Sequence, residues 1–252
     1  MKSSEKAPIS TFLAANPFPR PLTDGLFYRE KMRAIHRIAP DTLGVSARSA
    51  AVLEIGGGRS GLTSLLYPSA HVVTVDLDHL QLLQHPRLRN SSVVCGDACA
   101  LPFGDGSFDA VTMFDVLEHI PDDAKAASEA LRVTRPQGWL LLSTPNADWH
   151  YPYHRFMRRW CPPEARLMTE WGHVRRGYSG ATLVKLFGGN AERRSSFINP
   201  ITAFFHDVSF SRLRRRWRTL LYAAAAPATM VGYAAHASAM RGTETAFAWR
   251  RR

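Results

Sequence analysis

The stretch Val52-Leu53-Glu54-Ile55-Gly56-Gly57-Gly58-Arg59-Ser60-Gly61 joins a short apolar run directly to a cluster of glycines. An apolar run bounded by glycine is typical of a buried strand that turns into a helix. Glycine adopts positive φ without strain and lets a ligand approach the backbone amides at the start of the helix. The stretch therefore predicts a strand, a tight loop and a helix, with a ligand bound on the loop.

Similar apolar runs recur after this loop, with helical stretches between them that suit βαβ crossovers. The runs VLEI, VVTV and WLLLS are apolar on consecutive positions, as expected for strands of a parallel sheet that helices cover on both faces. We therefore predict an α/β fold with one doubly wound, mostly parallel, seven-stranded sheet. Its strands are expected at residues 51–55, 71–76, 91–95, 108–114, 140–144, 193–198 and 243–249.

The length of 252 residues suits a single α/β domain. Residues 1–21 contain four prolines and are expected to form an extended arm, and one helix is expected at 26–38. Residues 148–180 show no clear period and are expected to form a cap, followed by a short helix at 182–187. The expected parts are an N-terminal arm and helix (1–45), a ligand-binding half (46–147), and a third part (148–252) with the substrate cap, a helical insertion and the last strand.

The composition is that of a globular protein, with 45% hydrophobic and 21% charged residues. Cys95, Cys99 and Cys161 show no zinc-type pairing and the N-terminal residues show no secretory signal, so we expect a protein of the reducing cytoplasm. The net charge of +11 is concentrated in residues 151–252, which hold 18 Lys or Arg and 5 Asp or Glu. An anionic partner would meet this part of the chain, although solubility alone also explains the charge.

The glycine loop fits two kinds of cofactor. Gly56, Gly58 and Gly61 satisfy the dinucleotide pattern G-x-G-x-x-G, and Asp76 lies 20 residues after the first glycine. Glu54 favours the other kind, because a dinucleotide site needs no carboxylate at this position and a sulfonium amino acid does. We expect Glu54 to hold the methionine end of such a cofactor, through water or through the ammonium group.

From Ala51 to about Asn146 the chain resembles the class I S-adenosylmethionine-dependent methyltransferases, because EIGGG, VVTVDLD, GDA, FDAV and LRVTRPQGWLLLSTPN follow in the order and spacing of that family. The resemblance implies the Rossmann-like methyltransferase fold and S-adenosylmethionine as cofactor. It implies that Asp76 binds the ribose hydroxyls and Asp97 the adenine amine. The cofactor-binding residues expected from it are Glu54, Gly56, Gly57, Gly58, Asp76, Leu77, Asp97, Ala98 and Asp115. Gln137 departs from the family in a turn, where glycine is usual.

The string Asp115-Val-Leu-Glu118-His119 follows the fourth strand and supplies the candidates for chemistry. Methyl transfer needs mainly in-line positioning, and a general base helps when the acceptor is a hydroxyl. We expect Asp115 beside the methionine end and His119 as base or acceptor contact. The alternative is that His119 only braces the loop. His173 is a further catalytic candidate, and His150 and His154 are rival bases.

The same residues allow a metal interpretation. Asp115, Glu118 and His119 form D-x-x-E-H, which is similar to the E-x-x-E-H string with which ubiquinone-pathway O-methyltransferases and small-RNA 2′-O-methyltransferases hold a divalent ion, and His173 could add a ligand. Aspartate replaces the first glutamate of that string, however, and Glu118 could equally pair within the fold. We therefore expect no metal.

Before the last strand, the arginine-rich residues 212–218 precede an uncharged run that ends at Met240. The run is long enough to span a membrane, but it contains Pro227 and Gly232 and must return the chain to the sheet, so we expect no span. It is expected either to lie on an anionic membrane or to pack on the domain or a partner subunit.

The predicted function is S-adenosylmethionine-dependent methyl transfer, by O-methylation of a small molecule, a sugar or a lipid-linked intermediate. A nucleic-acid methyltransferase of the RNA 2′-O type is an alternative, but a nucleic-acid partner is not expected, because FDVLEHIPD is unlike the Asn/Asp-Pro-Pro-aromatic string of base-amine enzymes. A non-catalytic binding protein of the same fold is the third hypothesis. We expect a cytoplasmic location, with peripheral contact at the inner face of the membrane as an open alternative.

Overall fold

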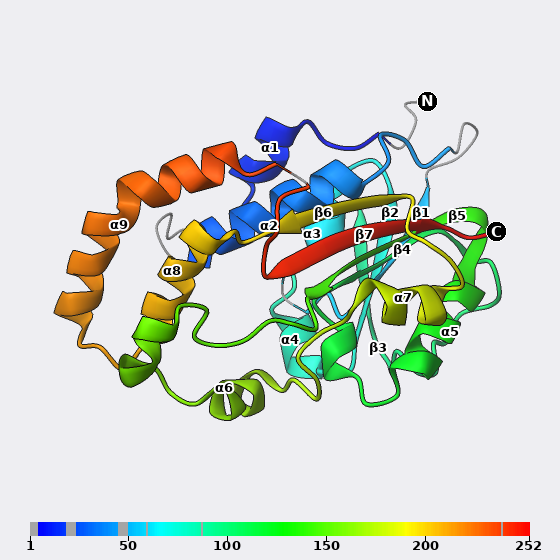
Figure 1. Cartoon of the computed structure of the whole chain (residues 1–252). Coiled ribbons are helices and arrows are strands. Elements are labelled where there is room, and N and C mark those ends of the chain that lie inside the picture. The colour runs from blue at the N-terminus through cyan, green and yellow to red at the C-terminus, as the bar shows by residue number, and fades with distance from the viewer. Residues whose placement is uncertain (1–4, 19–23, 45–49, 59, 87, 238) are drawn as a thin grey trace.

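The computed structural model describes residues 5–18, 24–44, 50–58, 60–86, 88–237 and 239–252. Seven strands form one sheet in the order β3-β2-β1-β4-β5-β7-β6 (Figure 1). The strands are β1 (Ala51–Ile55), β2 (His71–Asp76), β3 (Ser91–Cys95), β4 (Phe108–Phe114), β5 (Thr134–Pro145), β6 (Arg193–Phe197) and β7 (Glu244–Arg250). The helices are α1 (Ile9–Ala14), α2 (Asp24–Ile38), α3 (Leu62–Leu66), α4 (His79–Leu83), η1 (Leu117–His119), α5 (Asp123–Val133), η2 (Arg155–Trp160), α6 (Glu164–Trp171), α7 (Gly180–Phe187), α8 (Pro200–Ser209) and α9 (Arg215–Ala235).

The sheet confirms the predicted fold class. β1 to β5 pair in parallel, and β7 runs antiparallel to both β5 and β6. The strand order reverses at β1, which lies between β2 and β4, and ligands of such sheets bind at the carboxyl ends of the strands beside this reversal. β4 is buried at every position, but β3 is mostly exposed because it forms an edge. Burial on both faces therefore holds for the centre of the sheet and not for β3.

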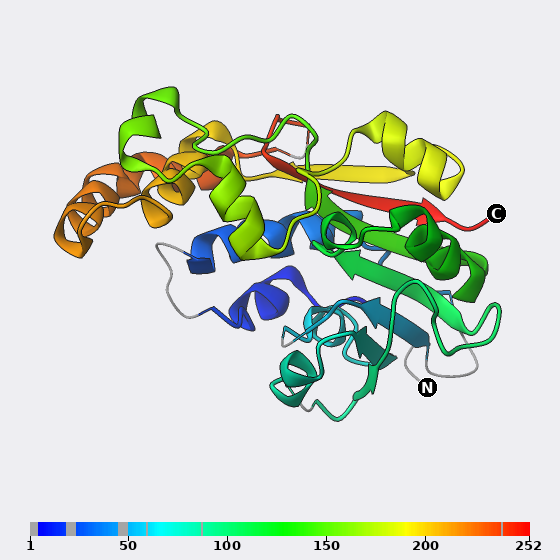
Figure 2. The ribbon, with the colours of Figure 1, turned by 90° about the horizontal axis from the view of Figure 1, so that it is seen from below.

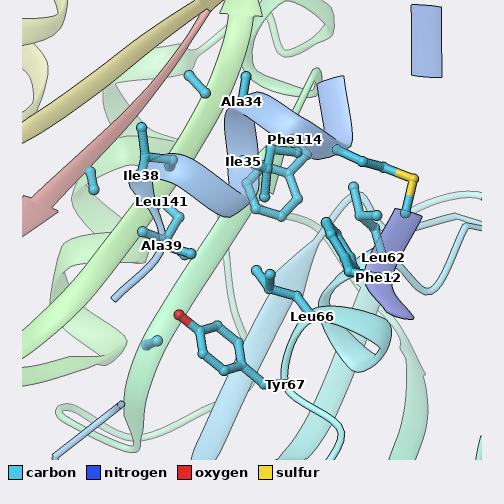
Figure 3. Close-up of a cluster of buried hydrophobic side chains, with 14 of the residues drawn as sticks. Phe12, Ala34, Ile35, Ile38, Ala39, Leu62, Leu66, Tyr67, Phe114 and Leu141 are labelled. Carbon is cyan, nitrogen blue, oxygen red and sulfur yellow. The ribbon is translucent and has the colours of Figure 1, made fainter. Parts of the chain in front are cut away.

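Helices cover both faces of the sheet. On one face, α2 packs through Ala34, Ile35 and Ile38 against Phe114 of β4 and Leu141 of β5 (Figure 3). On the other face, α5 and α7 contribute to a second apolar core. Because α2 lies across β6, β7 and β5, it can deliver side chains to the carboxyl end of the sheet.

The prolines predicted an extended N-terminal arm, but the arm is not extended throughout. Ile9–Ala14 form the short helix α1, with Pro8 at its N-cap. Proline has a φ compatible with a helix start, so Pro8 precedes the helix without disrupting it. Phe12 is buried in the core beside α2 and anchors α1 there. Pro19 and Pro21, on which the expected extended arm also rests, lie outside the described residues.

The strand β5 begins earlier than the expected residue 140, at Thr134. Gln137 lies in the left-handed region with φ 61°. A left-handed residue explains why glycine is usual at this position in the family, since glycine adopts positive φ without strain. The departure at Gln137 thus affects a turn of β5, far from the carboxyl ends of the strands.

The cap contains the helices η2 and α6, and most of its aromatic residues form a third apolar core. Trp149, Tyr151, Met157 and Leu167 are buried in it together with Val208 of α8. The helical insertion before β7 consists of α8 and α9, which extend from one end of the sheet (Figures 1 and 2). Within the ranges given above, no helix combines the length and hydropathy needed to cross a membrane.

Candidate functional site

A cavity of about 790 Å³ lies at the carboxyl ends of β1, β2 and β4, next to the point where the strand order reverses. Its wall includes Gly56 and Gly58 after β1, Asp76 at the end of β2, and Asp115 after β4. A cavity of this size is in the range that holds a drug-sized ligand. The structure therefore has a cavity where the sequence predicts the cofactor.

The glycine loop forms the floor of this cavity. Gly56 and Gly58 both have positive φ, 68° and 47°. A Cβ at Gly56 would lie 2.3 Å from a methyl group of Val116, so no other residue fits there without displacement. Gly61, also with positive φ, is the N-cap of α3. Three of the predicted glycines are thus required by backbone conformation or by close contact.

Glu54 lies beneath the loop and not in the cavity wall. Its carboxylate is 2% exposed and accepts hydrogen bonds from the amide (3.0 Å) and hydroxyl (2.8 Å) of Thr63 and from the hydroxyl of Thr74 (3.0 Å). Gly57 passes directly over it, since a Cβ there would lie 2.6 Å from the Glu54 carboxyl group. Glu54 therefore braces the loop, and Gly57 makes room for it. Its expected contact with the methionine end, through water or through the ammonium group, stays a prediction.

The predicted nucleoside residues Asp76, Leu77, Asp97 and Ala98 all line the cavity. The Gly58 amide donates to Asp76 Oδ2 (3.0 Å), which fixes the carboxylate at the rim. The Asp97 carboxylate accepts from the amide of Cys99 at 2.8 Å. Leu77 is 74% exposed and offers an apolar surface. The two fixed carboxylates suit hydroxyl and amine donors of a ligand. The exposed leucine suits a flat apolar ring.

Asp115 marks the other end of the cavity and is held by two side chains. It has a φ of 54°, accepts from the Ser143 hydroxyl at 2.5 Å, and forms an ion pair with Lys31 of α2 at 2.6 Å. Lys31 is only 12% exposed, and its Nζ also faces the ring of Tyr28 at 5.4 Å. The α2 helix is therefore part of the site, which the sequence interpretation missed. One signal was present, because Lys31 follows Phe27 by four positions on the apolar face of the helix.

His119 contacts His173, which does not itself line the cavity. His119 lines the cavity, and its Nδ1 lies 3.2 Å from the carbonyl oxygen of Gly172, where α6 ends. A carbonyl only accepts, so Nδ1 carries the proton and Nε2 keeps its lone pair. The two imidazole rings are perpendicular, with centroids 4.6 Å apart. Burial, with a smaller effect of His119, lowers the pKa of His173 to about 4, so His173 is neutral at physiological pH.

The cap holds this pair in place through the backbone of the loop after β4. The Val174 amide donates to the carbonyl of Glu118 at 3.1 Å. The Arg175 guanidinium donates to the carbonyls of Leu117 (3.0 Å) and Ile120 (2.7 Å). The rival bases lie elsewhere: His154 pairs with Asp207 at 3.0 Å, and His150 contacts cap backbone. The structure thus brings together His119 and His173, and neither rival lines the cavity.

Glu118 is fully buried beside this pair. Its Oε2 accepts from the Thr144 hydroxyl (3.1 Å), while Oε1 has no hydrogen-bond partner among the described residues. Burial, and then the charge of Asp115, raise the pKa of Glu118 to about 8. Ligand atoms of Glu118, His119 and His173 lie within 4.8 Å of one another, so these three residues could hold a divalent ion. Asp115, which the D-x-x-E-H comparison included, is not in this group and pairs with Lys31.

Comparison with known sequences identifies the central part of the chain. Residues 53–142 match a family model described as a methyltransferase domain. A demethylmenaquinone methyltransferase of Renibacterium salmoninarum is 34% identical over 125 residues, 48% of this chain and 52% of that protein. A ubiquinone/menaquinone biosynthesis C-methyltransferase of Hahella chejuensis is 39% identical over 117 residues, 42% and 47% of the two chains. The chain thus spans about half the length of the curated relatives it matches.

Solved structures show the same fold over most of the chain. The N-methyltransferase NodS from Bradyrhizobium japonicum, in complex with S-adenosylhomocysteine, has a TM-score of 0.55 at 16% identity and covers 96% of both chains. A putative sarcosine dimethylglycine methyltransferase from Galdieria sulphuraria has a TM-score of 0.54 at 18% identity, covering 83% of this chain and 81% of that one. Together with the glycine loop and the carboxylates at the ends of β2 and β3, these matches show that residues 53–142 form a methyltransferase domain of the class I S-adenosylmethionine-dependent type.

Proposed function

We propose that this chain transfers the methyl group of S-adenosylmethionine to a hydroxyl oxygen of a small molecule, a sugar or a lipid-linked acceptor. The single observation that carries the proposal is the position of His119. Its ring lines the cofactor cavity, and the carbonyl of Gly172 fixes the tautomer that leaves Nε2 free to accept a proton. A hydroxyl acceptor must lose a proton during methyl transfer, and an imidazole is suited to take it.

His119, Asp115 and His173 have separate roles in the proposed reaction. When bound, the cofactor supplies a methyl group attached to a positively charged sulfonium sulfur, and this sulfur leaves as a neutral thioether. As the oxygen–methyl bond forms and the sulfur–methyl bond breaks, His119 Nε2 takes the hydroxyl proton and later releases it to water. Asp115, fixed by Lys31 and Ser143, orients the methionine end. His173 is a positioning residue, because it packs edge to face against His119. Positioning of this kind supplies much of the rate enhancement of a displacement reaction.

C-methylation is the second candidate, and the similarity to a ubiquinone/menaquinone biosynthesis C-methyltransferase favours it. Carbon attack also needs proton removal, from the acceptor carbon or from a ring hydroxyl that activates it. The same His119 could serve either reaction, so the base does not distinguish them. The acceptor atom has to be identified from the product.

Product analysis tests the proposal directly. The protein is incubated with S-adenosylmethionine labelled with ¹³C in the methyl group and with separate acceptor pools of phenols, hydroquinones, sugars and membrane-lipid extract. We expect the label in a methoxy group, detected by carbon NMR and mass spectrometry. Label in a C-methyl group would replace the first candidate by the second. Absence of turnover in every pool, with the cofactor bound, would favour a non-catalytic binding protein.

Cofactor binding gives a separate expectation. Asp76→Ala should weaken the binding of S-adenosylmethionine and S-adenosylhomocysteine by roughly 5- to 150-fold, or about 1–3 kcal/mol, because it removes the acceptor for the ribose hydroxyls and frees the Gly58 amide. Isothermal titration calorimetry measures the change. Glu170→Ala, on the exposed surface of α6, is the control and should bind as the unchanged protein does. Equal affinity in Asp76→Ala, or binding of NAD, would contradict the assignment.

A further inference from the structure

The helix α9 exposes an apolar surface that the other described residues do not cover. Residues 219–240 contain no Asp, Glu, Lys or Arg, so most of the helix is uncharged on all sides. A helix with this composition is normally buried. In α9 only Thr229 and Gly232 are buried. The helix lies at one end of the molecule in both views, away from the C-terminus (Figures 1 and 2).

Six of the exposed residues of α9 fall on one narrow face. Positions 217, 220, 224, 228, 231 and 235 are all exposed and follow one another at intervals of three or four, the spacing of a single helix face. We call this face the α9 stripe. Its large members are Trp217 (51% exposed), Leu220 (58%) and Val231 (66%).

The opposite face of α9 makes the contact with the domain. Gly232 packs against Ile201 of α8, where an added Cβ would lie 3.0 Å from the Ile201 Cβ. The side-chain amide of Asn199 donates to the carbonyl of Gly232 at 3.0 Å. Because the domain already holds this face, the α9 stripe is free to meet something outside the molecule.

Arginines stand at the N-terminal end of the same helix. Arg212, Arg214, Arg215 and Arg216 are exposed, and residues 208–243 include no Asp or Glu. The first turn of α9 holds no acidic residue. Positive charge at a helix N-terminus opposes the helix dipole, so helix stability does not explain these arginines. Trp217 lies between them and the apolar part of the stripe, as an aromatic residue does at a membrane interface.

We propose that the α9 stripe and these four arginines dock on an anionic lipid bilayer surface, with the arginines at the headgroups and the stripe among the upper acyl chains. A nucleic acid would engage the arginines and leave the stripe in water. A second copy of the chain would bring its own arginines to the interface, with no acid in this segment to pair with them. The lipid surface satisfies both the charge and the apolar area. This proposal does not depend on methyl transfer.

Vesicle flotation tests the docking. The full chain is mixed with phosphatidylcholine vesicles that contain or lack phosphatidylglycerol. We expect flotation with the acidic vesicles, weakening as salt is added, and little with the neutral ones. Each arginine near the surface should contribute about fivefold to binding. Arg215→Glu/Arg216→Glu should therefore lose at least about 25-fold. Arg89→Glu/Arg252→Glu makes the same change in net charge at two exposed sites, between α4 and β3 and at the C-terminal residue, and should float like the unchanged protein.

A second pair of variants tests the stripe. Leu220→Gln/Val231→Gln should float poorly, while Leu80→Gln/Leu83→Gln, on the exposed leucines of α4 (68% and 57%), should not change flotation. Calorimetric binding of S-adenosylmethionine reports folding of every variant, so failure to dock is distinguished from failure of the proposed function. The proposal is overturned if the protein ignores acidic vesicles, if it instead retains an RNA duplex with a steep salt dependence, or if light scattering shows a dimer that the glutamine variants abolish.

Discussion

Replacing His119 with alanine is expected to lower the turnover number by about 10²-fold or more, the typical contribution of a general base. The affinity for S-adenosylmethionine should change by less than about threefold, because the ring meets the mouth of the cavity and the nucleoside residues are untouched. Single-turnover kinetics separates the chemical step from binding. The expected signature is a loss in kcat with little change in the dissociation constant of the cofactor.

His150→Ala is the matched control for this result, because His150 contacts cap backbone and the ring of Tyr153, does not line the cavity, and should leave the turnover number unchanged. A loss of less than about threefold in His119→Ala would assign His119 a bracing role against Gly172. Treatment with a chelator distinguishes a general base from a metal ligand. If activity collapses with a chelator and returns with magnesium or manganese, then Glu118, His119 and His173 act as ion ligands, and the unpartnered Glu118 Oε1 is explained.

The central strands could be predicted from the sequence because their signal is local. Residues 51–55, 71–76 and 108–114 are apolar on consecutive positions, and the structure places strands with these bounds. The expected roles of Asp76 and Asp97 came from the resemblance to the methyltransferase family; Asp76 ends β2, and Asp97 lies two residues after β3. Carboxyl ends of such strands meet at one edge, so position along the chain determines position in the site.

The contacts of Glu54 and Lys31 within the fold could not be predicted, because they join distant segments. A buried carboxylate needs hydrogen-bond donors, and Thr63 and Thr74 supply them to Glu54 below the loop. Lys31 reaches a residue 84 positions away in sequence. Neither the hydrophobic periodicity of α2 nor the sequence after β4 predicts the ion pair of Lys31 with Asp115. A cap was expected at residues 148–180, but its packing could not be predicted, since its aromatic core forms only when α8 packs on it.

Replacing Lys31 with methionine should lower the free energy of unfolding by roughly 2–3 kcal/mol, somewhat less than the loss for a fully buried pair because Asp115 is 27% exposed. Methionine keeps the aliphatic stem but leaves the Asp115 carboxylate without its cation. Burial, and then the charge of Asp115, already raise the pKa of Glu118 and of Glu244 on β7, so the local excess of carboxyl groups becomes harder to accommodate. For a domain of this size the melting temperature should fall by about 4–12 °C, measured by calorimetry.

Two further variants make the Lys31 result specific. Lys125→Met removes an exposed lysine of α5 and should change the free energy of unfolding by less than about 0.5 kcal/mol. The double variant Lys31→Met/Asp115→Asn should regain part of the loss, because the uncompensated charge is gone and the Ser143 contact can be kept. An unchanged melting temperature in Lys31→Met would show that the pair adds nothing to stability. Recovery of stability in the double variant without recovery of cofactor affinity would instead separate two roles of Asp115, one in the fold through Lys31 and one at the methionine end of the cavity.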